Sequence, residues 1–186
     1  MTDSAPYMAR NIEIKAWIES VGLLQLRIAA IADQGPTEML QEDTFFSCPN
    51  GKLKLRTFSD TAGQLIFYQR PNQTGPKESL YVISPTAAPG LLRDALTLAC
   101  GQAGRVCKHR TVFMVGRTRV HLDKIEGLGH FLELEVILAQ GEPAEAGIAI
   151  TYELLERLGI SLQQLIGESY VDLLANRSSE CARNSK

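Results

Sequence analysis

The chain has 186 residues, of which 45% are hydrophobic, and it carries a formal net charge of −2 at pH 7. This length and apolar content suit one compact domain with a sizeable core, and the slightly negative charge excludes a global basic surface for nucleic acid. No apolar run reaches the length of a membrane span, and the start of the chain lacks the basic-then-apolar form of a signal peptide. We therefore expect a cytoplasmic protein that binds neither nucleic acid nor membranes.

The secondary structure expected along the chain is that of an α+β protein. A loose lead-in at residues 1–8 precedes an alternating strand at 10–18 and a helix at 20–33, with Ser20 as its N-cap and Gln34-Gly35-Pro36 as its end. The remaining strands are expected at residues 38–47, 52–58, 64–70, 78–84, 105–115, 117–124 and 130–138, and the remaining helices at 89–99, 144–158, 161–166 and 169–175. Residues 9–176 are assigned to a single domain, and the polar segment 177–186 to a disordered tail.

Eight mostly antiparallel strands with a few helices favour a sheet that curls. Asn50-Gly51 is a strong signal for a hairpin between two of these strands. A sheet with so many strands often curls or closes, because closure protects the edge strands. A closed barrel has an inside, and a charged inside requires something charged to occupy it.

Charged residues alternate with apolar ones along residues 117–135. Arg119, His121 and Asp123 share one face of a strand, and Glu133 and Glu135 share one face of the next, because successive strand side chains point to opposite faces. An antiparallel sheet with one face in water gives the same alternation, and for a single strand that is the preferred explanation. Recurrence of the pattern in other strands makes a solvated sheet face a weaker explanation.

The alternation recurs in several other expected strands. The acids in register are Glu13, Asp123, Glu133 and Glu135, and the bases in register are Lys15, Lys54, Arg56, Arg70, Lys108, Arg110 and Arg119. Seven bases against four acids leave an excess of positive charge within a protein that is negative overall. Because confined charges need partners, this imbalance fits a polyphosphate bound together with a divalent cation.

Each residue type has a physical task in such a site. Arginine binds phosphate oxygens bidentately and lysine acts as a mobile point charge. The carboxylates of Glu13, Glu133 and Glu135 offer the oxygen ligands that Mg²⁺ or Mn²⁺ prefers. The residues whose roles stay open, as site groups or as packing and surface groups, are Lys77, Tyr81, Arg117, His121 and Tyr170. Lys52 is expected in a solvated turn, and Trp17 in the core.

With these residues in view, the chain resembles the CYTH-domain superfamily, which contains class IV adenylate cyclases and thiamine triphosphatases. The segment 11–15 is similar to the E-x-E-x-K motif of that family, and the agreement is closest at 108–110 and at 116–136 (GRTRVHLDKIEGLGHFLELEV). Further similar segments are 52–56, 68–71, 75–81 and 168–174. The resemblance implies an eight-stranded antiparallel β-barrel, the triphosphate tunnel fold, with flanking helices and charged residues inside.

The resemblance also implies roles for the matching residues. Those that match the metal site for Mg²⁺ or Mn²⁺ are Glu13, Glu133 and Glu135, and those that match triphosphate-binding positions are Lys54, Arg56, Arg70, Arg110 and Arg119. Lys15, Lys108 and Asp123 match positions with a catalytic role. Asn11 stands where the motif has its first glutamate, which removes a negative charge and should weaken a second metal site most.

Three functions are compatible with the sequence. The first is a class IV adenylate cyclase-like enzyme that converts ATP to cyclic AMP and pyrophosphate. The second is a triphosphatase acting on tripolyphosphate, thiamine triphosphate or a nucleoside triphosphate, and the third is a module that binds a triphosphate without turnover. Each takes a small triphosphate as its partner. A homodimer is a candidate assembly, and no motif specifies it.

Overall fold

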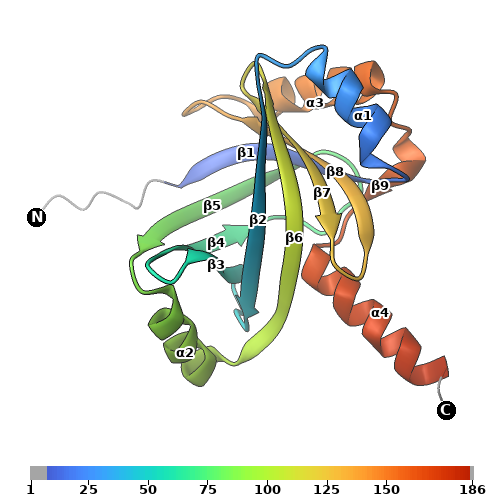
Figure 1. The fold of residues 1–186 in the computed structure, drawn as a ribbon. Helices are drawn as coiled ribbons and strands as arrows, with labels where there is room; N and C mark the ends of the chain where they lie inside the picture. Colours follow the sequence, from blue (N-terminus) through green and yellow to red (C-terminus); the bar gives the residue numbers. More distant parts are fainter. Residues whose placement is uncertain (1–7, 185–186) are drawn as a thin grey trace, which may run out of the picture.

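The computed structural model describes residues 8–184 and has an α+β architecture (Figure 1). Within these residues the strands are β1 (Ala9–Ile18), β2 (Gln34–Phe46), β3 (Lys52–Ser59), β4 (Ala62–Gln69), β5 (Lys77–Thr86), β6 (Gln102–Val115), β7 (Thr118–Ile125), β8 (Gly129–Ile137) and β9 (Leu165–Ile166). The helices are α1 (Val21–Ala29), α2 (Pro89–Cys100), α3 (Ala144–Leu158), the short 3₁₀ helix η1 (Leu162–Gln164) and α4 (Tyr170–Asn184). Most of the expected lead-in, residues 1–7, and the end of the expected tail, residues 185–186, lie outside the described residues.

The strands β1 to β8 close into an antiparallel barrel, which confirms the predicted fold. Around the barrel the strands follow the order β5, β4, β3, β2, β6, β7, β8 and β1, and β1 pairs with β5 to complete the ring. Closure rests on β1, where Glu13 is paired with Glu135 on β8 and with Lys77 on β5. The two-residue strand β9 adds a further pairing to β1, between Lys15 and Ile166. One strand therefore joins both walls of the barrel and the segment that precedes α4.

The boundaries of several elements differ from the sequence prediction. Helix α1 ends at Ala29, well before the predicted end, and Gln34 already begins β2 because it pairs with Met114 on the long strand β6. The helix expected at 161–166 is limited to η1, because Leu165 and Ile166 pair with β1 instead. Helix α4 continues to Asn184, so it includes most of the segment for which a tail is expected.

The largest hydrophobic core lies outside the barrel wall. Outward-facing side chains of β1, β7 and β8, among them Ile14, Val120 and Leu134, pack against helices α1 and α3, which cover this side in Figure 1. Gly147 lets α3 approach the strands closely, because a Cβ at this position would lie 2.6 Å from the Ile12 side chain. Since the apolar residues of these strands face the helices, their alternate residues must face inward, and this arrangement places charge inside the barrel.

Helix α4 begins against one end of the barrel. Tyr170 and Val171 at its start pack with Phe45, Val106 and Phe131 in a second apolar cluster. Trp17, expected in the core, is 44% exposed instead, because it lies beyond the charged residues of β1. Within residues 8–184 the structure contains no helix that is long and apolar enough to cross a membrane.

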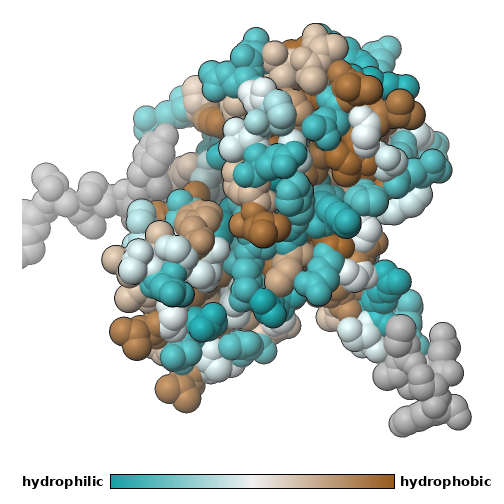
Figure 2. All heavy atoms as spheres, in the orientation of Figure 1, coloured by the Kyte–Doolittle hydropathy of each residue, from teal (hydrophilic) through white to brown (hydrophobic). Residues whose placement is uncertain are grey.

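The outer surface mixes hydrophilic and hydrophobic residues. Figure 2 shows hydrophobic side chains at its lower left, over α2, where Leu91 and Leu98 are 76% and 89% exposed. On the rest of the face in view, hydrophilic and hydrophobic residues are intermixed. The homodimer stays a prediction.

Candidate functional site

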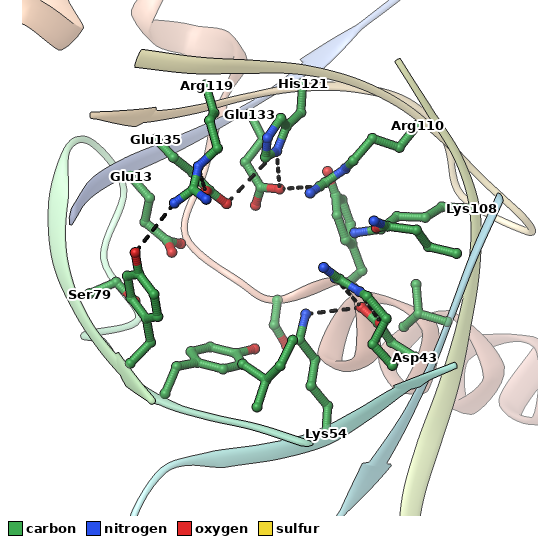
Figure 3. A pocket seen from close by; sticks show the side chains of 18 of the residues that line it. Glu13, Asp43, Lys54, Ser79, Lys108, Arg110, Arg119, His121, Glu133 and Glu135 are labelled. Atoms are coloured by element: carbon green, nitrogen blue, oxygen red, sulfur yellow. Dashed lines mark hydrogen bonds and ion pairs between the residues drawn. The ribbon is translucent and has the colours of Figure 1, made fainter. Parts of the chain in front are cut away.

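The inward faces of the barrel strands enclose a charged cavity of about 330 Å³. Figure 3 shows side chains from opposite walls pointing toward its centre. Among the described residues, the bases that line it are Lys15, Lys54, Arg56, Arg70, Lys108, Arg110 and Arg119, and the acids are Glu13, Asp43, Glu133 and Glu135. The structure therefore brings together ten of the eleven site residues predicted from the sequence.

Asp123, the remaining predicted residue, lies behind the cavity wall. Its side chain is fully buried, and Arg110 donates to both of its carboxylate oxygens, at 2.6 and 2.5 Å. The Tyr170 hydroxyl donates to the same carboxylate at 3.0 Å. Burial opposes ionisation of Asp123, but the charges of Arg110 and Lys108 outweigh it and lower the pKa to about 2. Asp123 thus orients Arg110, and its predicted catalytic role would be indirect.

The cavity holds more fixed positive than negative charge. Seven bases and four acids line it among the described residues. Counting Asp123, which pairs with Arg110, gives seven bases against five acids and a formal excess of two positive charges. Each of these bases lies within 3.9 Å of one of the acids, and the excess leaves the cavity suited to an anion.

Asp43 is a cavity residue that the sequence prediction missed. It lies on β2, and its carboxylate pairs with Lys54 at 2.9 Å and with Arg56 at 2.8 Å. Burial opposes its ionisation, but the Lys54 ammonium and the Arg56 guanidinium hold its pKa well below the usual range. The run Gln41-Glu42-Asp43 has no alternation to reveal it. The Asn50-Gly51 signal indicates the hairpin but not its register, because β2 ends at Phe46 and the longer connection pairs Asp43 with Arg56.

Three cations of one wall donate to backbone carbonyls in the segments next to β5 and α4. Lys15 Nζ donates to the Glu168 carbonyl at 3.2 Å, and Arg70 donates to the Gly167 carbonyl at 3.1 Å. Lys77, which is only 2% exposed, donates to the Gln73 carbonyl at 2.9 Å and does not line the cavity. The sequence leaves Lys77 open between a site role and a packing role, and its position agrees with packing.

The other open residues divide between the cavity and the surface. Tyr81 lines the cavity, and its hydroxyl lies 3.4 Å from the Arg119 guanidinium. Arg117 instead forms an ion pair with Glu142 at 2.6 Å and does not line the cavity. Lys52 is not a free turn residue as predicted, because its ammonium lies 2.6 Å from Asp172 at the start of α4.

His121, Glu133 and Glu135 form a cluster with the spacing of a metal site. One ligand atom from each lies within 4.8 Å of the others. His121 Nδ1 is buried and has no hydrogen-bond partner among residues 8–184. Carboxylate oxygens suit Mg²⁺ or Mn²⁺, so the groups present fit a divalent cation. Glu13, the third carboxylate predicted as a ligand, is outside this cluster and pairs with Arg70 at 3.0 Å.

Lys108 has the electrostatic environment of a proton-transfer group. Its Nζ lies 3.9 Å from the Asp123 carboxylate and 5.5 Å from the centre of the Tyr170 ring. Burial and then the charge of Arg110 lower the pKa of Lys108 to about 7. A lysine with this pKa exchanges its proton near neutral pH, as a general acid or base must.

Comparison with known proteins gives the same fold and related sequences. The protein is 28% identical over 168 residues to adenylate cyclase CyaB of Aeromonas hydrophila, and the alignment covers 86% of each chain. Among solved structures, the PH1012 protein of Pyrococcus horikoshii superposes with a TM-score of 0.78 at 21% identity, over 88% of this chain and 98% of the other. HpAC1 of Hippeastrum, described as having a dominant triphosphatase activity, superposes with a TM-score of 0.60 at 18% identity, over 92% and 96% of the two chains.

A family model settles the relationship that the motifs and the barrel point to. The model of the CYTH domain matches residues 9–170, which include all of the barrel strands and the first residue of α4. The matched segment contains every residue that lines the charged cavity. The chain therefore belongs to the CYTH domain family.

Proposed function

We propose that this protein is a divalent-metal-dependent enzyme that acts on a triphosphate, and that its reaction is the class IV adenylate cyclase-like conversion of ATP to cyclic AMP and pyrophosphate. The observation that carries the proposal is the enclosed excess of two positive charges. A nucleoside triphosphate carries about four negative charges near neutral pH, because the second pKa of a terminal phosphate is about 6. Together with one divalent cation it carries about two, which balances the excess when Lys108 is protonated; the neutral form of Lys108 leaves an excess of one.

The bases of the cavity would hold the triphosphate. Arg56, Arg110 and Arg119 present guanidinium groups that can bind phosphate oxygens bidentately, while Lys54 adds a point charge. In the structure these cations pair with cavity carboxylates, as Arg119 does with Glu135 at 3.1 Å. Those contacts keep the donors ordered before a substrate enters, so less conformational entropy is lost on binding.

The carboxylates of Glu133 and Glu135 would hold the divalent cation, with Glu13 nearby on β1. A cation held there would polarise phosphate oxygens and offset negative charge at the reacting phosphorus. Neutral Lys108 would accept the proton of the ribose 3′-hydroxyl as that oxygen bonds to the α-phosphorus. The bond from the α-phosphorus to the bridging oxygen then breaks, and pyrophosphate leaves with the negative charge stabilised by the surrounding bases.

A triphosphatase is the second candidate. The fold shared with HpAC1 of Hippeastrum, for which triphosphatase activity is described, favours it. Lys15 would then position the attacking water. Its Nζ lies 3.6 Å from Glu133, the carboxylate proposed as a metal ligand, so it is near the point where a terminal phosphate would meet the cation.

Purified protein with ATP and Mn²⁺ or Mg²⁺ distinguishes the candidates. We expect equal amounts of cyclic AMP and pyrophosphate, measured by chromatography. Glu133→Gln and Glu135→Gln should each lower turnover by at least about 10²-fold, since each removes a charged ligand from a metal that stabilises the transition state. Glu38→Gln is the matched control, because Glu38 is exposed and does not line the cavity.

The other outcomes have separate meanings. Orthophosphate released from tripolyphosphate, thiamine triphosphate or ATP, without cyclic AMP, would replace the cyclase by the triphosphatase. Calorimetric binding of a triphosphate with no product from any of them would leave only a binding module. Full activity of both glutamate variants would contradict the site assignment.

Tyr170 provides a further prediction about the arrangement of the bases. Its ring centre lies 3.9 Å from Lys15 Nζ and 5.5 Å from Lys108 Nζ, so it contributes cation–π contacts to both. Tyr170→Leu should lower kcat/KM for ATP by about tenfold, since each contact is worth roughly 0.5–2 kcal/mol. Tyr170→Phe keeps the ring and should retain most of the activity. Tyr152→Leu is the control, because Tyr152 is exposed, and equal losses in the two Tyr170 variants would contradict the role of the ring.

A further inference from the structure

His121 has a position that neither solvation nor the hydrogen-bond network of the barrel explains. It lies on β7, is 4% exposed, and points into the cavity between two glutamates of β8 (Figure 3). Its Nδ1 accepts or donates no hydrogen bond within residues 8–184. A buried polar atom without a partner costs roughly 1–3 kcal/mol, so an unfilled ring nitrogen aimed at two carboxylates indicates a missing partner.

The distances identify what that partner must be. His121 Nδ1 lies 3.8 Å from Glu133 Oε2 and 3.8 Å from Glu135 Oε1, too far for a hydrogen bond to either. Two atoms that bind one cation at about 2.1 Å lie roughly 3–4 Å apart, depending on the angle between them. Both distances from the imidazole nitrogen fall in this range, and one ligand atom from each of the three residues lies within 4.8 Å of the others, so the group has the spacing of cation ligands rather than of hydrogen-bond partners.

We propose that His121 is a nitrogen ligand of the cation, and that a His121–Glu133–Glu135 set makes this site prefer Mn²⁺ to Mg²⁺. The inference rests on the proposed metal dependence and adds the identity of the third ligand. Mg²⁺ strongly prefers oxygen ligands, whereas imidazole is a better ligand for transition metals. Replacing one oxygen donor by a ring nitrogen therefore shifts the preference toward Mn²⁺.

The neighbouring acidic positions support a site centred on these three side chains. Glu13 is held by Arg70, whose Nε lies 3.0 Å from the carboxylate. Asn11, also buried in the cavity lining, offers only a neutral oxygen. Each of the three glutamates pairs with an arginine, so the difference lies in the donor set: β1 offers one carboxylate and Asn11, whereas β8 offers two carboxylates next to His121. Glu133 Oε2 also accepts from Arg110 at 2.6 Å, which fixes its orientation toward His121.

Pulsed electron paramagnetic resonance of Mn²⁺ bound to the protein without any triphosphate tests the proposal directly. We expect a ¹⁴N coupling in the wild-type protein that changes to a ¹⁵N coupling when histidine alone is ¹⁵N-labelled. The coupling should disappear in His121→Ala and persist in His109→Ala. His109 is the matched control because it lies on the outer face of β6, with a side chain that is 44% exposed.

Calorimetry gives a second measurement on the same proteins. His121→Ala should weaken Mn²⁺ binding by at least about tenfold while changing Mg²⁺ binding by less than about threefold, in line with the usual cost of losing a group that shapes a metal site. The His121→Gln variant, which keeps a polar side chain in the buried position, replaces His121→Ala if the latter does not fold by circular dichroism. The labelling measurement uses the wild-type chain and does not depend on either variant.

The result that would overturn the proposal is Mn²⁺ binding with no histidine coupling, unchanged Mn²⁺ affinity in the His121 variants, or no Mn²⁺ binding at millimolar concentration. These outcomes are separate from a failure of the proposed function. A protein that shows the histidine coupling but forms neither cyclic AMP nor orthophosphate would keep the metal ligand and lose the enzymatic proposal. Turnover of ATP without histidine coupling would keep the enzymatic proposal and exclude His121 as a metal ligand.

Discussion

Replacing Lys108 with arginine is expected to lower kcat for ATP by about 10²- to 10⁴-fold, the usual contribution of a positioned general base. Lys108 can act as a base because burial and the neighbouring Arg110 lower its pKa to about 7. An arginine at this position keeps the positive charge and can still contact phosphate, but it does not lose its proton in the accessible pH range. The loss should therefore fall on kcat, while KM changes little.

The same assignment predicts the direction of the pH dependence. The base works only when neutral, so kcat/KM should rise with pH through about 7 and level off above it. Bound phosphates stabilise the ammonium form, so the rise in kcat should be shifted to higher pH. Stopped assays of cyclic AMP across pH 5.5–9 in the wild type and in Lys108→Arg would measure both effects.

Two controls make the Lys108 result specific. Lys124→Arg is the matched substitution, because Lys124 is an exposed residue on the adjacent strand β7. Lys108→Met keeps similar volume without charge, so it separates loss of the base from strain caused by the larger arginine. A Lys108→Arg enzyme that keeps its rate within about threefold, with an unchanged pH profile, would exclude Lys108 as the base.

The strand faces of the site could be predicted because a two-residue period is a local property of the sequence. In β1, Ile12 and Ile14 alternate with Glu13 and Lys15, and one apolar face is enough to fix where the charged face points. The apolar face packs under α1 and α3, so the charged face is inside. The same reasoning places Arg119 inside. Alternation alone would put Arg117 on the same face, but Arg117 precedes β7 and pairs with Glu142 instead.

What the sequence could not predict depends on contacts between distant segments. Asp123 has the right alternation for the cavity, yet Arg110 and Tyr170 of two other elements cover it completely. Asp43 belongs to the cavity although its own strand shows no clean period, because pairing with Arg56 decides its position. The spacing of residues along one strand predicts neither the burial of a side chain by other elements nor the partner of a residue on the neighbouring strand.

Segment ends were the other source of error, for a related reason. The sequence around Gln34 predicts the end of a helix. In the structure β6 is long enough to pair with this residue, so Gln34 belongs to the sheet. Lys52 reads as a turn residue, but the ion pair with Asp172 of α4 draws it toward the barrel end. Local propensity is a weak guide wherever a distant strand or helix offers the backbone or the side chain a partner.

Removing the carboxylate of Asp123 is expected to have the largest effect on stability. Asp123→Ala leaves the buried Arg110 guanidinium with Glu133 as its remaining partner, and it removes the acceptor of the Tyr170 hydroxyl. Breaking a buried ion pair in this way typically costs about 3–5 kcal/mol of unfolding free energy. Urea unfolding of Asp123→Ala, with Asp94→Ala of the exposed face of α2 as control, would measure the loss.

The pairing should also appear in the dependence of stability on pH and on Arg110. The pKa of Asp123 is lowered to about 2 in the folded protein, below the value of 3.8 for an ordinary aspartate, so the carboxylate stabilises the fold above about pH 4 and this contribution is lost as pH falls toward 2. Asp123→Ala should therefore show a shallower loss of stability over that range than the wild type. Arg110→Met combined with Asp123→Ala should cost less than the two single changes added together, because each single change breaks the same Arg110–Asp123 pair and the double variant loses it only once. Strict additivity of the two changes would mean that Asp123 and Arg110 are not coupled, and Asp123 would then not be the residue that orients Arg110.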